Sequence, residues 1–295
     1  MEGYSVLMSV YCRERPEYLR MAVESMLGQT DAAPSEFVLV CDGPLTRELD
    51  AVIDAFCAGY PALFHILRLE ENRGLGAALN AGLQVCSHEL VARMDSDDIA
   101  LPDRMRLQLD AWEQHPGLSA LGGQIAEFAH SPDDITAYRH VPTEPDQILS
   151  YLKRRSPMNH TTTLLRKSHV LEVGGYGEVA GFEDYFLWIK LISRGFFLAN
   201  VPLVCCRVRA DAAMYRRRGG WRYFKNAVKI ESFLLHSGLI TTWEYTQNVV
   251  VRFAGTVLVP TELRRRLFLR FLRLRAREET ENRSGFPLFA QVERI

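Results

Sequence analysis

The 295-residue chain is 47% hydrophobic and 24% charged, an ordinary globular composition for one large domain or for one domain with an appendage. Its formal net charge of −1 gives no whole-molecule attraction for nucleic acid or for an acidic partner, so nucleic-acid binding is not expected. No stretch approaches the roughly 20 apolar residues that span a bilayer, and the first residues lack the features of a signal peptide, so we expect a cytoplasmic protein.

The six cysteines agree with a reducing compartment. None is spaced as CxxC, and most lie in apolar runs, which indicates buried and reduced thiols. They are Cys12, Cys41, Cys57, Cys86, Cys205 and Cys206.

Strand and helix alternate along the first hundred residues. Short apolar runs bounded by polar residues predict strands at residues 6–11, 37–41, 64–69 and 90–92. Apolar residues at helical spacing predict helices at residues 16–27, 49–56 and 75–85. This alternation predicts an α/β fold with a parallel sheet, right-handed crossovers and flanking helices.

The second half is less regular. We expect a kinked strand at residues 120–128, a short helix at 146–152, a segment at 159–166 that becomes a strand, and a helix at 181–191. After residue 210 the pattern changes, and helices are expected at residues 221–234, 242–259 and 260–275.

The most informative stretch is residues 93–99, which read RMDSDDI. An apolar run leads directly into Asp95, Asp97 and Asp98, and Pro102 then opens a helix. Clustered acids at the end of such a strand lie where α/β folds bind ligands, and they repel one another unless a cation lies between them. Mg²⁺ or Mn²⁺, which prefer oxygen ligands, fit this role. The alternative is a solvated acidic turn that caps the following helix.

Polar residues also follow the other three strands of this half. They are Ser9 and Tyr11, then Asp42, then Asn72 and Arg73. Parallel strands bring these positions to one edge, where Asp42 can face a base or ribose and Arg73 a phosphate. Each residue taken alone is an ordinary turn or cap residue. The absence of a GxGxxG or GxxxxGK[ST] motif argues against a dinucleotide dehydrogenase or a P-loop NTPase.

A second acidic pair, Glu183 and Asp184, opens the helix expected at residues 181–191. Carboxylates are favoured at a helix N-terminus for purely structural reasons. Here the aromatic residues Phe182, Tyr185 and Trp188 surround the pair. Partial desolvation by such neighbours gives a carboxylate the raised pKa that suits a general base.

Five motifs, in this order and at this spacing, resemble those of family 2 glycosyltransferases. They are Ser9-Val10-Tyr11, Val40-Cys41-Asp42-Gly43, Asn72-Arg73-Gly74-Leu75, Asp95-Ser96-Asp97-Asp98 and Glu183-Asp184-Tyr185. The resemblance covers roughly residues 4–210. The sequence around the motifs is most similar to the bacterial exopolysaccharide branch of the family, including amylovoran-biosynthesis and capsular glycosyltransferases. It implies an inverting enzyme with the GT-A fold, a Rossmann-like, mainly parallel sheet with flanking helices, followed here by a helical C-terminal appendage.

Carried over position by position, the resemblance implies a donor site, a metal ligand and a catalytic base. Asp97 would bind a divalent cation, Mn²⁺ or Mg²⁺, and Asp184, next to Glu183, would deprotonate the acceptor hydroxyl. The nucleotide-sugar site would comprise Ser9, Tyr11, Glu14, Asp42, Asn72, Arg73, Asp95 and Ser96. The acceptor side would comprise His160, Thr161 and Trp188.

One stretch departs from the family pattern. Many relatives carry a histidine after a Tyr-Arg-x sequence near the last strand, whereas this chain has Arg207 and then Arg209 in that region. An arginine does not ligate a metal, but it pairs with phosphate, so these two residues are expected to contact the diphosphate. The departure leaves the full coordination of the metal open.

The resemblance divides the chain at about residue 210. Residues 1–210 would form the GT-A domain, with a nucleotide-sugar half at about 1–100 and an acceptor half at about 101–210. Residues 211–295 would form a basic helical region, in which residues 260–275 are apolar on one side and rich in arginine elsewhere. Such a helix either lies on an anionic inner-membrane surface or packs on the catalytic domain with its arginines in water.

The expected reaction is transfer of a hexose from a nucleotide-diphosphate sugar, with UDP as the default base, to a hydroxyl of a saccharide. The acceptor would be a growing, lipid-linked exopolysaccharide, O-antigen or capsule repeat unit. The alternative is a non-catalytic sugar-nucleotide-binding scaffold subunit of a polysaccharide assembly complex. A nucleotidyltransferase is disfavoured because the first strand is not followed by a glycine-rich loop.

Overall fold

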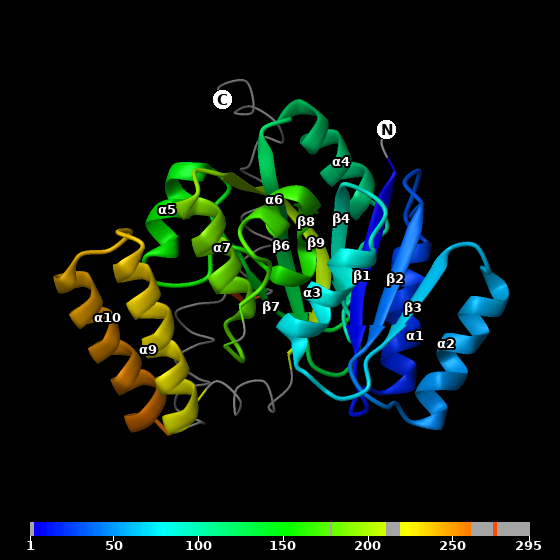
Figure 1. Cartoon of the computed structure of the whole chain (residues 1–295), viewed down its shortest axis with the longest axis horizontal. Coiled ribbons are helices and arrows are strands. Elements are labelled where there is room, and N and C mark those ends of the chain that lie inside the picture. The colour runs from blue at the N-terminus through cyan, green and yellow to red at the C-terminus, as the bar shows by residue number, and fades with distance from the viewer. Residues whose placement is uncertain (1–2, 178, 211–218, 261–273, 276–295) are drawn as a thin grey trace.

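In the computed structural model, which describes residues 3–177, 179–210, 219–260 and 274–275, a mixed β-sheet lies between two layers of helices (Figure 1). Four neighbouring parallel strands form one half of the sheet, in the order β3-β2-β1-β4. Their bounds are β1 (Tyr4–Val10), β2 (Glu36–Cys41), β3 (Phe64–Arg68) and β4 (Leu90–Asp95). The predicted parallel sheet is confirmed for this half.

The other half of the sheet contains both strand directions. From β4 the sheet continues through β8, β6 and β7 to β10, with β9 pairing to β6 and β5 to β9. β8 runs antiparallel to both β4 and β6, whereas β6 and β9 are parallel. The bounds are β5 (Ile99–Ala100), β6 (Leu118–Phe128), β7 (Ile135–Arg139), β8 (Leu164–Arg166), β9 (Phe197–Arg209) and β10 (Leu274–Arg275).

Each face of the sheet has its own helical layer and its own hydrophobic core. One face carries α1 (Pro16–Leu27), α2 (Arg47–Gly59) and α4 (Arg104–Gln114). The opposite face carries α3 (Leu75–Val85), α5 (Pro145–Leu152), α6 (Lys167–Glu172) and α7 (Glu183–Ser193). Successive side chains of β1 point to opposite faces of the sheet. Val6 and Met8 therefore lie in the first core, and Leu7 lies in the second.

Two further helices form a hairpin outside α7, at the side of the molecule away from α1 and α2 (Figure 1). They are α9 (Gly220–His236) and α10 (Thr242–Phe253), and a short π-helical turn, Ala254–Leu258, follows. Ala227, Ile230 and Leu234 of α9 are buried in the second core. A capping box between Thr241 and Glu244 starts α10. No helix in the described residues is long and apolar enough to cross a membrane.

The expected strand at residues 159–166 is only partly correct. Residues His160–Thr162 form a 3₁₀ turn, and the strand is limited to Leu164–Arg166. The hydroxyl of Thr162 donates to the carbonyl of Asn159 at 2.7 Å, and that of Thr163 donates to the carbonyl of His160 at 2.9 Å. These local side-chain bonds compete with strand pairing, which the β-branched composition alone does not reveal.

Two other expectations need correction or lie outside the described residues. The helix expected to open at Pro102 begins at Arg104, because residues 102–103 form a turn in which the backbone N–H of Arg104 donates to the carbonyl of Leu101 at 3.0 Å. The helix expected at residues 260–275 falls mostly in residues 261–273, which are not described. Its last two residues, Leu274 and Arg275, are not helical but pair with β7 as the strand β10.

A glycine sets the close approach of α3 to the sheet. A Cβ atom at Gly82 would lie 2.4 Å from Leu7 Cδ1 and 2.7 Å from Val40 Cγ2. Both neighbours are fully buried, so they have little room to move. This contact holds the C-terminal half of α3 against the middle of β1 and the end of β2.

We predict that Gly82→Ala lowers the free energy of unfolding by about 1–3 kcal/mol, because the added methyl group overpacks a dense core. Gly59→Ala is the matched control, since a Cβ atom there meets nothing within 4 Å. The control should be neutral or stabilising by up to about 1 kcal/mol. Urea unfolding measures both, and equal effects of the two substitutions would contradict the packing argument.

Candidate functional site

The ends of the four parallel strands meet at one edge of the sheet, as the alternation of strands and helices predicted. Ser9 near the end of β1 pairs with Asp95 at the end of β4 and with Val40 in β2. Asp42 follows β2 directly and is almost fully buried. These positions therefore lie at one edge of the sheet, and the loops that follow the strands begin there.

Asp42 fastens the loop after β3 to the end of β2. Its two carboxylate oxygens accept hydrogen bonds from the backbone N–H groups of Arg73, at 2.7 Å, and Gly74, at 3.0 Å. Asn72 donates its side-chain amide to the carbonyl of Asp42 at 3.2 Å. Gly74 has a φ of +87°, which favours glycine at this sharp entry to α3. Hydrogen bonds thus join the three residues predicted from the sequence, Asp42, Asn72 and Arg73, where the loop before α3 meets the end of β2.

The three aspartates after β4 form a compact group. Carboxylate oxygens of Asp95, Asp97 and Asp98 all lie within 4.8 Å of one another. Ser96, between them, donates its hydroxyl to Glu14 Oε2 at 2.7 Å, which brings the loop after β1 to the same place. The structure therefore gathers the predicted donor-site residues Glu14, Asp95 and Ser96 around Asp97.

The electrostatics of this group favour a bound cation. Burial, reinforced by the charges of Asp95 and Glu14, raises the pKa of Asp97 to about 7. Burial and the neighbouring Asp97 raise the pKa of Asp98 as well. A set of hard oxygen donors whose charges are not balanced is the environment that Mg²⁺ or Mn²⁺ prefers, so the residues present fit a divalent cation.

Sequence reasoning missed Arg93, a fully buried cation beneath the aspartates. Its guanidinium forms an ion pair with Asp95, and its backbone carbonyl accepts a hydrogen bond from Arg104 at 2.9 Å. Nε and Nη1 of Arg93 have no hydrogen-bond partner in the described structure. The available signal was its position two residues before Asp95, because residues i and i+2 of a strand lie on the same face.

The second acidic pair lies at the start of α7. Asp184 accepts a hydrogen bond from the hydroxyl of Ser156 at 3.0 Å. Glu183 is half-buried, and this burial raises the pKa of its carboxyl group. A Cβ atom at Gly76, in the first turn of α3, would lie 3.1 Å from Glu183 Cγ. The acidic pair therefore adjoins the helix that begins directly after the Asn72–Gly74 loop.

The predicted acceptor residues lie mostly inside the protein. His160 Nε2 is 3.1 Å from the hydroxyl of Tyr176, and burial together with Arg93 lowers the pKa of this imidazole. Thr161 accepts a hydrogen bond from the backbone N–H of Asp95 at 3.3 Å, which ties the 3₁₀ turn to β4. Trp188 is fully buried, with its ring centroid 6.2 Å from that of His160. A direct contact of Trp188 with an acceptor would require this ring to become accessible.

The two arginines of β9 have different surroundings. Arg209 lies beside the aspartates: its backbone N–H donates to Asp98 Oδ1 at 3.0 Å, and its guanidinium carbon is 3.6 Å from the ring centroid of Tyr18. Arg207 instead pairs with Asp133 at 2.8 Å on the surface. The remaining predicted donor residue, Tyr11, is exposed on the loop after β1 and can contact a ligand without rearrangement.

Known proteins that are similar to this chain are described as glycosyltransferases. Residues 5–174 match the family model described as glycosyl transferase family 2. A glycosyltransferase of Haemophilus influenzae, described as uncharacterized, is 42% identical over 92% of this chain and 99% of its own length. The amylovoran biosynthesis glycosyltransferase AmsE of Erwinia amylovora is 40% identical, over 77% of this chain and 84% of its own.

A relative of named specificity comes from Escherichia coli. This UDP-Gal:alpha-D-GlcNAc-diphosphoundecaprenol beta-1,3-galactosyltransferase is 34% identical over 92% of this chain and 96% of its own. Among solved structures, residues 1–349 of S. aureus TarS in complex with UDP superpose with a TM-score of 0.62, at 17% identity over 95% of this chain and 77% of that one.

A second solved structure is the mannosyltransferase PcManGT of Pyrobaculum calidifontis in complex with GDP-Man and Mn²⁺. It superposes with a TM-score of 0.58, at 16% identity over 88% of this chain and 77% of that one. At these low identities the two superpositions establish the fold, which is the GT-A fold that the sequence motifs implied.

We predict that Arg93→Met lowers the free energy of unfolding by about 3 kcal/mol, because it leaves Asp95 and its neighbours without a counter-charge. In a double-mutant cycle with Asp95→Asn, the double variant should lose clearly less than the sum of the two single losses. Urea unfolding of the four proteins measures this coupling.

Arg194→Met is the control, because its ion pair with Glu172 is exposed and should contribute less than about 1 kcal/mol. If Arg93→Met behaved like this control, or if the cycle showed additivity, Arg93 would not be the counter-charge of the cluster.

Proposed function

The chain belongs to glycosyl transferase family 2, and from this premise we propose that it is an inverting hexosyltransferase that uses a nucleotide-diphosphate sugar. The observation that carries the proposal is the group of Asp95, Asp97 and Asp98 at the carboxyl edge of the parallel strands. We assign the catalytic role to residues 1–210 and treat residues 211–295 as an appended region.

The donor site in this proposal occupies the edge formed by β1 to β4. Tyr11 and the loop held by Asp42 and Asn72 face the nucleoside, and Arg73 faces the diphosphate. UDP is the proposed base, supported by the UDP-Gal named for the Escherichia coli relative and by the UDP bound to TarS. Ser9 near the end of β1, and Glu14 and Ser96 in the neighbouring loops, complete the site.

Asp97 is the proposed metal ligand, with Asp95 and Asp98 beside it. When bound there, Mn²⁺ or Mg²⁺ would offset the negative charge that develops on the diphosphate leaving group. Arg209, whose backbone is held by Asp98, adds a positive charge at the same edge, whereas Arg207 would have to leave Asp133 to take part.

Asp184 is the proposed general base. Its carboxylate accepts the proton of an acceptor hydroxyl while the oxygen of that hydroxyl attacks the anomeric carbon. The bond from that carbon to the diphosphate oxygen breaks in the same step, and its electron pair leaves with the nucleotide. Attack from the opposite face inverts the configuration, so an α-linked donor yields a β-linked product. Ser156 holds one oxygen of Asp184 and thereby orients the carboxylate.

Glu183 and His160 shape the acceptor side in this proposal. Glu183 lies against the first turn of α3, next to the proposed base. His160 is buried against Tyr176 and stays neutral, since burial disfavours the imidazolium form. Thr161 links the turn that carries His160 to the proposed metal site, because its hydroxyl accepts a hydrogen bond from the backbone of Asp95.

The proposed acceptor is a saccharide attached to a lipid diphosphate at the cytoplasmic face of the membrane. Two relatives support it: one is named for amylovoran biosynthesis, and the other for a diphosphoundecaprenol-linked sugar. The product would be a repeat unit of an exopolysaccharide, capsule or O-antigen. The expected membrane contact of residues 260–275 falls mainly outside the described residues, and it stays part of this proposal.

We predict that Asp184→Asn lowers kcat by a factor of about 10²–10⁴, since the amide no longer accepts the acceptor proton. The dissociation constant for UDP should stay within about twofold, because the variant keeps the donor site intact. Release of UDP from the sugar nucleotide in the presence of acceptor measures the first quantity, and calorimetry measures the second.

Ser156→Ala is the companion variant and should show a smaller loss of kcat, because the base remains but is less well oriented. Turnover of Asp184→Asn at near wild-type rate would contradict the assignment of the base. Failure of the wild-type chain to transfer any sugar while it binds UDP would favour the scaffold function instead.

A further inference from the structure

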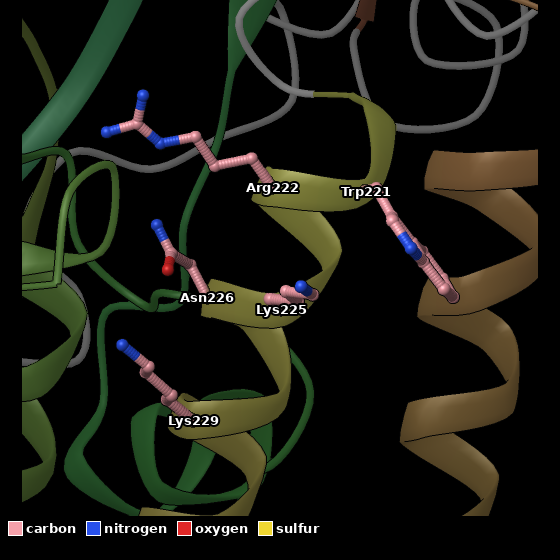
Figure 2. Close-up of a pocket in the computed structure, with 5 residues that line it drawn as sticks. All are labelled: Trp221, Arg222, Lys225, Asn226 and Lys229. Carbon is pink, nitrogen blue, oxygen red and sulfur yellow. The ribbon is translucent and has the colours of Figure 1, made fainter.

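Helix α9 carries a pocket that the proposed reaction does not use. Trp221, Arg222, Lys225, Asn226 and Lys229 line it, around a volume of about 290 Å³. Figure 2 shows Arg222, Asn226 and Lys229 on successive turns of α9, pointing to the same side, with Trp221 directed toward α10. The pocket thus combines three cations, an amide and an indole ring within three helical turns.

The three cations of this pocket have no counter-charge in the described part of the chain. Arg222, Lys225 and Lys229 form no ion pair there, whereas Arg252 of α10 pairs with the buried Glu231 of α9. Residues three and four apart lie side by side on a helix, so these cations repel one another. A bound anion would relieve this repulsion, and three cations suit an anion with several charged oxygen atoms.

The pocket is attached to the catalytic helix. Asn226 donates its side-chain amide to the carbonyl of Ala180 at 3.1 Å, and the ring centroids of Tyr223 and Phe182 are 4.9 Å apart. Phe182 is the N-cap of α7, and the proposed base Asp184 follows it by two residues. Residues of α9 therefore contact the segment that leads directly into Asp184.

We propose that this pocket binds the diphosphate group of a lipid-linked sugar acceptor. The inference rests on the proposed function, because it assigns the anionic part of the same acceptor to named residues. Arg222, Lys225 and Lys229 would form charge-assisted hydrogen bonds with the phosphate oxygens, and Asn226 would add a neutral donor. The helix then acts as a selectivity element that distinguishes a diphosphate-linked sugar from the same sugar without phosphate.

The hairpin also favours a phosphate that is attached to lipid. Trp243, Val250 and Val251 of α10 are largely exposed, at 69%, 61% and 69%. These side chains are costly to leave in water but suit a membrane interface or an isoprenoid chain. A free nucleotide or inorganic diphosphate would make no use of them.

The test measures binding of farnesyl diphosphate to the full chain in the presence of a chelator, which limits metal-dependent binding at the donor site. We expect Lys225→Ala/Lys229→Ala to weaken this binding about tenfold or more, because two charge-assisted contacts are lost. Lys225→Arg/Lys229→Arg should restore most of it. The matched control is Arg20→Ala/Arg47→Ala, which removes two exposed cations from α1 and α2 and should leave the dissociation constant unchanged.

Two further probes separate the sources of the phosphate. Inorganic diphosphate should bind more weakly than farnesyl diphosphate, and farnesol should bind more weakly still. Equal binding of inorganic diphosphate would overturn the lipid-linked ligand. Unchanged binding in the lysine variant, an equal loss in the control, or no binding by the wild type would overturn the pocket itself. Titration of UDP with Mn²⁺ on the same proteins tests the donor site separately, so the proposed function can hold where this inference fails.

Discussion

The arrangement of the site depends on like charges that the fold holds together at the end of one strand. Three aspartates lie within 4.8 Å of one another after β4, and burial raises the pKa of two of them. Such a group costs folding free energy unless a cation balances it. The protein supplies part of the balance through the buried Arg93, and we propose that a divalent ion and a diphosphate bind at the remaining negative charge.

The parallel half of the fold and its edge were predictable from the sequence. Apolar runs bounded by polar residues located β1 to β4, and the rule that parallel strands end at one edge brought Ser9, Asp42 and Asp95 together. The acceptor half was less predictable, because its geometry depends on contacts between distant segments. The Asp184–Ser156 bond and the burial of Trp188 against His160 join segments that no local pattern connects.

Sequence reasoning overlooked Arg93 for a different reason. Arg93 lies in an apolar run, where a cation is unexpected, and its role becomes clear only when Asp95 is seen beside it. For Asp42, the sequence predicted a contact with a nucleoside. The structure shows in addition that both of its carboxylate oxygens accept hydrogen bonds from the backbone of Arg73 and Gly74. Substituting Asp42 therefore disturbs the loop as well as any direct contact.

The central claim is that the aspartate group binds a nucleoside diphosphate through a divalent cation, with Asp97 as the ligand. The most direct measurement is calorimetric titration of UDP, GDP and dTDP, each with and without Mn²⁺, on the wild type and on Asp97→Asn. The account predicts that UDP binds the wild type only with Mn²⁺ and does not bind the variant under either condition. Metal-independent binding, or equal binding by Asp97→Asn, would contradict it.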